Sequence, residues 1–214
     1  MTYRLYGSDG SGSGIVEMAL AEVGVAVELQ PVSLRENAQR SDAYARLNPE
    51  RKIPTLLTPS GEVLTESAAI VLVLDERFPA ARLLPERGTP ERAQALRWLT
   101  FLACELYPII EIVDYPERFA PDAASTPGVR ERAKHIWQSR WPLVEGAIAG
   151  EPWLLASGFC ATDLYLSVLS RWDLDPTWRA EHLPKVDAIA RAVAQRPRSG
   201  PILRRHHPRT ATPG

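Results

Sequence analysis

The sequence predicts two domains of different kinds, an α/β domain followed by a domain that contains only helices. Strand-like runs separated by glycine and proline are confined to the first third of the chain. Beyond them we find helical patterns but no convincing pair of strands, and all six tryptophans lie there. The 214 residues are enough for one or two domains. The expected boundaries are 1–79 for the α/β domain, 80–89 for a linker, 90–205 for the helical domain and 206–214 for a flexible tail.

The beginning of the chain predicts a strand, a helix and a second, parallel strand. Residues 3–6 are strand-like and end at the Gly/Ser run of residues 7–14. Residues 15–23 have helical spacing, and residues 25–32 alternate apolar and polar side chains. Gly24 is expected to end the helix. Such a βαβ unit has a right-handed crossover.

Two acidic residues of this helix are expected to meet water. The apolar face is formed at helical spacing by Val16, Ala19, Leu20 and Val23. Glu17 and Glu22 lie off that face.

The following fifty residues complete the order βαβαββα. Residues 35–46 have modest helical character, and residues 53–58 and 63–65 flank a Pro/Gly turn as a hairpin would. Residues 68–78 form a strongly apolar helical run. The linker is expected next because four helix-breaking residues follow: Pro79, Pro85, Gly88 and Pro90.

The second domain is predicted to begin with two long helices, each opened by a threonine followed by proline. The first begins at Thr89 and should bend at Pro108, and the second begins at Thr126 and should kink at Pro142. Shorter helices are expected over 160–172 and 184–195.

Composition argues against several function classes. A formal net charge of −1 leaves no basic excess for a nucleic-acid backbone. No window approaches ~18 uninterrupted apolar residues, so we expect no membrane span. Cys104 and Cys160 follow no metal or redox spacing, and the first residues lack a secretory pattern. A cytoplasmic protein without metal is expected.

A proline at a strand start is the first candidate binding element. Pro54 cannot donate to a strand ladder. If the Ile53–Pro54 bond is cis, the backbone of Ile53 turns outward, and an extended peptide could pair with its N–H and C=O. The alternative is an ordinary trans proline, which is far more common.

The helix after the hairpin offers a second element. Helix N-termini bind anions through free N–H groups and the dipole. Ser67 could donate to a carboxylate and Glu66 could pair with an ammonium, which suits an amino acid or a γ-glutamyl group. The alternative is a capping serine beside a favourable acid.

The Gly/Ser run between the first strand and the first helix is the third element. A hydroxyl at this helix start could donate to a thiolate, whereas the alternative is a flexible turn with Ser13 as N-cap. A dinucleotide-binding loop is disfavoured because the third glycine of G-x-G-x-x-G would fall at Ile15, and because one βαβ unit is too few.

Together, the strand–Ser/Gly loop–helix start, the NPERKIPTL segment and the LTESAAI segment resemble the glutathione S-transferase family in order and spacing. The resemblance covers roughly residues 3–200. It implies a thioredoxin-like first domain, an all-α second domain, glutathione as co-substrate and a homodimer. Residues that could face the partner chain are Arg97, Thr100 and Glu105.

The same resemblance assigns residues to glutathione. It implies that the backbone of Ile53, beside cis Pro54, pairs with the cysteinyl unit, and that Glu66 and Ser67 hold the γ-glutamyl end. The side chains that it brings to the glycyl carboxylate are Lys52 or Arg51, and Gln39.

Family members stabilise the glutathione thiolate with an early Tyr, Ser or Cys. Placement on the cysteine-using members puts Gly12 at that position, and placement on the serine-using members puts Ser11 at or beside it. We therefore expect Ser11 to be catalytic, with Ser13 as second candidate. Tyr6 is a poorer candidate because it lies inside the strand.

The implied function is transfer of the glutathione thiolate to a small hydrophobic electrophile; the alternative is a non-catalytic glutathione-binding or protein-interaction module. The sequence does not choose among conjugation, dehalogenation, isomerisation, ether cleavage and peroxide reduction. The electrophile is expected against the long helix of the second domain. Its candidate lining is Tyr107, Ile110, Tyr115 and Phe119, although core packing explains each of them at least as well.

One departure from the family concerns a helix cap. The family usually has Ser/Thr-x-x-Asp at the start of a core helix, and this chain has Cys160 three residues before Asp163. A thiol is a weak acceptor, so half of the capping box should be impaired, while Asp163 can still reach the Cys160 N–H.

Overall fold

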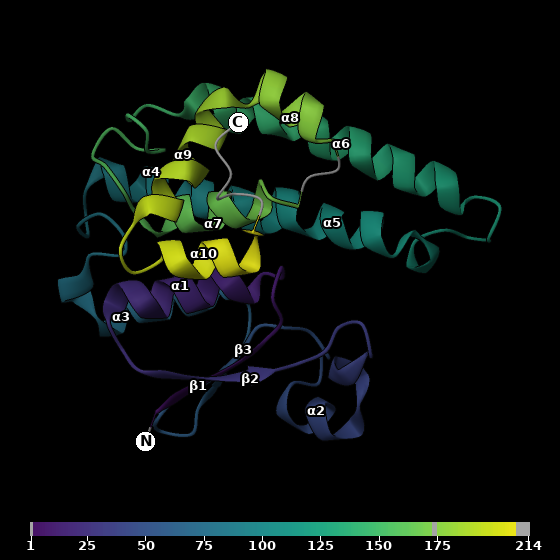
Figure 1. Cartoon of the computed structure of the whole chain (residues 1–214), viewed down its shortest axis with the longest axis horizontal. Coiled ribbons are helices and arrows are strands. Elements are labelled where there is room, and N and C mark those ends of the chain that lie inside the picture. The colour runs from purple at the N-terminus through teal and green to yellow at the C-terminus, as the bar shows by residue number, and fades with distance from the viewer. Residues whose placement is uncertain (1, 173–174, 209–214) are drawn as a thin grey trace. The chain divides into compact units, whose positions relative to one another are not determined.

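A computed structural model of the chain describes residues 2–172 and 175–208 (Figure 1). Its contacts divide the chain into two compact units, Met1–Glu86 with Arg191–Gly214, and Arg87–Ala190. The expected boundaries differ from this division at the C-terminal end, where residues 191–205 join the first unit. Helical periodicity predicts that a helix forms, but it does not say which neighbour the helix packs on.

The first unit contains a four-stranded sheet in the order β2-β1-β3-β4. The strands are β1 (Tyr3–Gly7), β2 (Val27–Pro31), β3 (Thr55–Leu57) and β4 (Val63–Leu64). β1 and β2 are parallel, whereas β3 is antiparallel to both β1 and β4. The expected βαβ unit and hairpin are therefore confirmed. Leu5 and Leu56, which lie opposite each other, are buried.

Helices cover this sheet. α1 (Ser13–Val23) and α3 (Ser67–Arg77) lie side by side, and α2 (Asp42–Leu47) follows the short 3₁₀ turn η1 (Ala38–Arg40) (Figure 1). A second 3₁₀ turn, η2 (Pro79–Ala81), follows α3. α1 ends as expected at Gly24, whose φ of 78° lies in the left-handed region that favours glycine.

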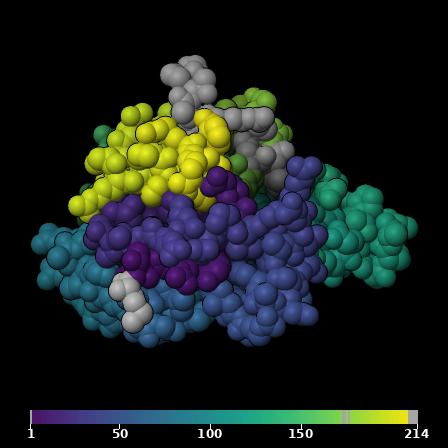
Figure 2. All heavy atoms as spheres, turned by 60° about the horizontal axis from the view of Figure 1, so that its bottom comes forward, coloured from purple at the N-terminus to yellow at the C-terminus, as the bar shows by residue number. Residues whose placement is uncertain are grey.

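The C-terminal helix α10 (Gly200–His206) packs on α1. Figure 2 shows the yellow end of the chain directly against the purple residues of the N-terminal part. His206, expected to open a flexible tail, instead ends α10 and is 6% exposed. The remaining tail residues 209–214 lie outside the described residues.

The carboxylates of α1 explain this packing. Glu17 and Glu22 were expected to meet water, but they are only 6% and 8% exposed. Arg196 binds Glu22 with two hydrogen bonds of 3.0 and 2.9 Å, and Arg205 binds Glu17. The C-terminal segment thus supplies the cations that make burial of both acids tolerable.

The second unit is helical, as expected. It contains α4 (Pro90–Phe101), the π-helix η3 (Leu102–Leu106), α5 (Tyr107–Asp114), η4 (Pro116–Arg118), α6 (Thr126–Ala147), α7 (Ala161–Leu169) and α8 (Pro176–His182). α9 (Pro184–Gln195) crosses the division between the units.

The long first helix changes its winding where the sequence predicts a bend. The N–H of Tyr107 donates to the carbonyl of Leu102, five residues back. Pro108 has no N–H to donate to the carbonyl four residues back, and its ring would clash with that carbonyl in a regular α-helix. The wider π-helical turn accommodates the proline. α6 continues through Pro142.

The core of the second unit is formed around α7. Trp137 and Trp141 of α6 are fully buried and pack edge to face at 5.3 Å. Asp163, also fully buried, accepts hydrogen bonds from the N–H groups of Cys160 (2.8 Å) and Leu154 (2.9 Å). No helix among residues 2–172 and 175–208 combines the length and apolarity that crossing a membrane requires.

Candidate active site

Ile53 lies just ahead of β3, and its peptide bond to Pro54 is cis. The residue is half-buried. None of the backbone hydrogen bonds found among the described residues uses its N–H or C=O. An extended peptide could therefore add to the sheet here as a further strand.

A buried polar network fixes the residues on both sides of Ile53. Tyr44 Oη and Asn48 Nδ2 each donate to the Lys52 carbonyl at 2.9 Å. Both also contact Thr55 Oγ1, at 2.9 and 3.1 Å. Burial raises the pKa of the Tyr44 phenol, which keeps it a neutral donor. Sequence reasoning missed this network, although Asn48 opens the NPERKIPTL segment.

The N-terminus of α3 lies at the same end of the hairpin. Leu56 of β3 pairs with Leu64 of the antiparallel β4, so the chain enters β3 and leaves β4 at the same end of the hairpin. Ser67, the first residue of α3, is 4% exposed, whereas Glu66 is exposed. Glu66 has a φ of 60°, which costs a non-glycine residue about 1–3 kcal/mol and is typical of ligand sites.

The side chains expected at the glycyl carboxylate differ in their surroundings. The Arg51 guanidinium contacts the Arg40 carbonyl and the Asp42 carboxylate. Gln39 is 7% exposed, and its Oε1 has no hydrogen-bond partner among the described residues. Lys52 is exposed. Their roles in binding stay predictions.

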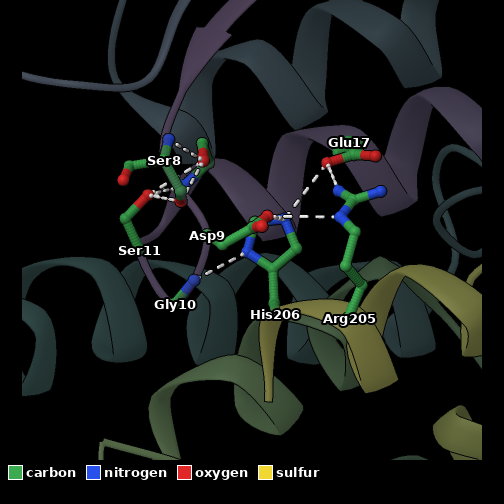
Figure 3. Close-up of polar contacts among 8 residues, drawn as sticks. Ser8, Asp9, Gly10, Ser11, Glu17, Arg205 and His206 are labelled. Carbon is green, nitrogen blue, oxygen red and sulfur yellow. Dashed lines mark hydrogen bonds and ion pairs between the residues drawn. The ribbon is translucent and has the colours of Figure 1, made fainter. Parts of the chain in front are cut away.

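We call residues 8–13, between β1 and α1, the serine loop. Ser11 Oγ donates to the Ser8 carbonyl at 2.6 Å (Figure 3). It also lies 2.8 Å from Ser13 Oγ. Ser13 Oγ is also 3.1 Å from the Ser8 carbonyl. Both hydroxyl groups can therefore donate to the same Ser8 carbonyl, and either can instead donate to the other hydroxyl.

The two serines differ in exposure. Ser11 is half-buried, whereas Ser13 is 2% exposed and accepts the Ser8 N–H at 3.1 Å. A Cβ at Gly7 would lie 2.4 Å from Ser13 Oγ, so Ser13 fills the space that Gly7 leaves. The N-cap of α1 is Gly12, not Ser13. This geometry favours Ser11 over Ser13 as the hydroxyl that can meet a ligand.

The serine loop is also held from the far end of the sequence. The Gly10 N–H donates to His206 Nδ1 at 3.2 Å, and Arg205 Nε lies 3.2 Å from Asp9 Oδ1 (Figure 3). Sequence reasoning missed both contacts because it assigned residues 206–214 to a tail. The basic run of residues 204–206 was the available hint.

The candidate electrophile residues lie in the second unit. Tyr107 packs against Trp172 with ring centroids 4.8 Å apart, and Ile110 is 8% exposed. The Arg118 guanidinium carbon lies over the Tyr115 ring, 3.8 Å from the ring centroid. Phe119 is 48% exposed. Core packing thus describes Ile110 best. The role of the other three stays a prediction.

No group of three His, Cys, Asp or Glu side chains within the described part of the chain could hold a metal ion. The candidate site combines the Ile53 backbone, which could pair with a peptide, the N-terminus of α3 and the serine loop. This combination suits a small peptide with a carboxylate end and a thiol.

Known proteins resemble this chain over about two thirds to nearly all of its length. The family profile described as "Glutathione S-transferase, N-terminal domain" matches residues 13–77. The GST-like protein YncG of Escherichia coli (strain K12) is 31% identical over 95% of this chain and 98% of its own. A probable maleylacetoacetate isomerase of Vibrio cholerae is 35% identical over 66% of this chain and 64% of its own.

A solved structure extends the similarity. A sphingomonad glutathione S-transferase complexed with glutathione matches with a TM-score of 0.76 at 29% identity, covering 95% of this chain and 98% of that one. The expected combination of a thioredoxin-like domain and a helical domain is thereby confirmed.

Proposed function

Since the chain belongs to the glutathione S-transferase family, we propose that it binds glutathione beside Ile53 and transfers the thiolate to a small hydrophobic electrophile. The observation that carries the proposal is the position of Ile53. Its backbone makes no hydrogen bond found among the described residues, and it lies at the hairpin end where α3 begins. The cysteinyl unit would pair with Ile53 while Glu66 and Ser67 bind the γ-glutamyl end.

Ser11 is the proposed thiolate donor. A free thiol titrates near ~8.5, so only about 3% is thiolate at pH 7. Lowering this pKa by ~2 units requires about 2.7 kcal/mol. One charge-assisted hydrogen bond supplies roughly 1.5–3 kcal/mol of that, and the N-terminus of α1 adds ~0.3–1 kcal/mol. The thiolate fraction at pH 7 would rise about 25-fold, and complete ionisation limits any gain to about thirtyfold.

The shared acceptor makes this donation feasible. When Ser11 turns its proton toward a thiolate, the Ser8 carbonyl loses a 2.6 Å hydrogen bond. The Ser13 hydroxyl lies 3.1 Å from the same carbonyl and can donate in its place. The carbonyl then keeps a partner, which reduces the cost of the exchange.

The test is the ultraviolet absorbance of the glutathione thiolate in the complex, measured as a function of pH. Wild type is expected to lower the pKa of bound glutathione, and Ser11→Ala to raise it again by about 1–2 units, which lowers the thiolate fraction at pH 7 roughly 3- to 25-fold. Ser139→Ala is the matched control, because Ser139 is an exposed serine of α6 that donates to the Ile136 carbonyl of its own helix. Equal titrations of Ser11→Ala and wild type would refute the role of Ser11.

A non-catalytic glutathione-binding module is the second candidate. It is favoured by one observation, namely that the Ser11 proton is already engaged at 2.6 Å. This alternative predicts glutathione binding without thiolate absorbance. If the thiolate forms, a panel of electrophiles that includes a maleylacetoacetate-type substrate follows, since an isomerase of that name is among the relatives.

A further inference from the structure

His206 contacts the serine loop through one nitrogen and α1 through the other. Its Nδ1 accepts the Gly10 N–H at 3.2 Å, and its Nε2 lies 3.1 Å from Glu17 Oε2 (Figure 3). A backbone N–H can only donate, so Nδ1 carries no proton. The proton is therefore on Nε2, where it donates to the Glu17 carboxylate.

Glu17 fixes this tautomer. Burial alone would raise the pKa of the Glu17 carboxyl, but hydrogen bonds and charge from His206 and Arg205 lower it below its ordinary value. The carboxylate thus stays ionised and accepts from the imidazole. Arg205 also forms an ion pair with Asp9. Through Arg205 and His206, α10 therefore contacts Asp9 and Gly10, the two loop residues directly before Ser11.

The fold reserves space for the imidazole ring. A Cβ at Gly14, in the first turn of α1, would lie 2.8 Å from His206 Nδ1. The absence of that Cβ lets the ring approach the loop. Gly10 has a φ of 76°, which glycine adopts without strain. The contact therefore depends on glycine at both places.

We propose that His206 is a positioning residue for Ser11. By accepting the Gly10 N–H, it fixes the backbone directly before Ser11 and so orients the Ser11 hydroxyl at the N-terminus of α1. The proposal rests on the proposed function, because Ser11 matters only if a thiolate lies there. His206 itself does not touch the thiol.

Two substitutions separate the two nitrogens of His206. In His206→Asn, the amide oxygen can take the place of Nδ1 and accept the Gly10 N–H, while the contact with Glu17 is lost. In His206→Gln, the amide group can reach Glu17, while the acceptor for Gly10 is lost. His135→Gln is the control because His135 is an exposed residue of α6.

The experiment measures two quantities in wild type, Ser11→Ala and the His variants. One is the pKa of bound glutathione, and the other is hydrogen exchange of the Gly10 amide. We expect His206→Gln to raise the thiol pKa by about one unit, which lowers the thiolate fraction at pH 7 roughly threefold. Its Gly10 amide should exchange at least tenfold faster. His206→Asn should stay near wild type in both.

The outcomes are distinguishable. If Ser11→Ala raises the thiol pKa but His206→Gln does not, the role of His206 is wrong while the proposed function stands. If the Asn and Gln variants behave alike, positioning through Nδ1 is also refuted. If Ser11→Ala leaves the thiol pKa unchanged, the proposed role of Ser11 fails and the His206 proposal falls with it.

A second route avoids reliance on one variant. Should His206→Gln not fold, Gly14→Ala displaces the intact imidazole by introducing a Cβ 2.8 Å from Nδ1. It is expected to raise the thiol pKa and speed Gly10 exchange in the same direction. A folded Gly14→Ala protein with wild-type values of both would overturn the proposal.

Discussion

Two segments of the candidate site are held in place in different ways. The segment around Ile53 is fixed by Tyr44 and Asn48, which are 8 and 4 residues from the Lys52 carbonyl they bind. The serine loop depends on His206, 196 residues away from Gly10. The first segment brings its supports within one stretch of sequence, whereas the second needs the C-terminal helix. A local motif can therefore include the supports of the Ile53 segment without including those of the serine loop.

The largest expected effect comes from removing the acid that links α10 to α1. Glu17→Ala should lower the free energy of unfolding by about 3 kcal/mol, because it removes hydrogen bonds to two partners, one of them charged. Urea denaturation measures the loss. Exchange should accelerate at Gly10 but not at Thr55. Acceleration at both amides would show that the two segments are not separately supported.

The same variant has a predictable pH dependence. The pKa of Glu17 is lowered in the folded state, so its stabilisation is present above the ordinary pKa and is lost as pH falls through the folded value. The stability difference between wild type and Glu17→Ala should accordingly shrink in acid. A difference that stays constant down to acid unfolding would argue against an ionised Glu17.

An intermediate effect is expected at the other segment. Asn48→Ala removes hydrogen bonds to the Lys52 carbonyl and Thr55 Oγ1 in a buried place, which should cost about 2 kcal/mol of unfolding free energy. The affinity for glutathione, measured by calorimetry, should fall because Ile53 loses its fixed neighbours. Gly10 exchange is expected to be unchanged. An unchanged affinity would show that the Tyr44–Asn48 network does not contribute to glutathione binding.

The smallest effect serves as a control in the second unit. Both contacts of the capping box are present at the start of α7, including the one that Cys160 was expected to impair. Burial and the Asp163 charge raise the pKa of the Cys160 thiol to about 12, so the acceptor in this box is a neutral thiol, which is a weak acceptor. Cys160→Ser should stabilise the protein by ~0.5 kcal/mol, since a hydroxyl oxygen caps better. Calorimetric unfolding measures it, with local exchange of Gly10 and Thr55 expected to stay the same. A lower melting temperature would contradict the capping argument.

The sequence predicts the elements better than it predicts their supports. Period-two and helical patterns identify the βαβ unit, the hairpin and the end of α1 at Gly24, because each depends on neighbours in sequence. The burial of Glu17 could not be predicted, since it depends on Arg205 and His206 reaching back from α10. Helix α8 was missed, although Asp175 caps it through the Trp178 N–H.

The candidate site follows the same division. Ile53, Glu66 and Ser67 lie in motifs that are contiguous in sequence, and the structure brings them to one end of the hairpin. The family resemblance ranks Ser11 before Ser13, but the difference in exposure between them was not predictable, because it depends on space beside Gly7. The homodimer, the cytoplasmic location and the electrophile pocket stay predictions.

The contact between Gly10 and His206 also has a consequence during biosynthesis. At about 5–20 residues per second, the ribosome needs at least ~10 s to proceed from one residue to the other. Throughout that interval the nascent chain can fold its sheet and the Tyr44–Asn48 network, but the serine loop waits for its last support. A chain that ends before α10 would lack the contact between His206 and Gly10 while keeping the contacts that Tyr44 and Asn48 make with the Lys52 carbonyl.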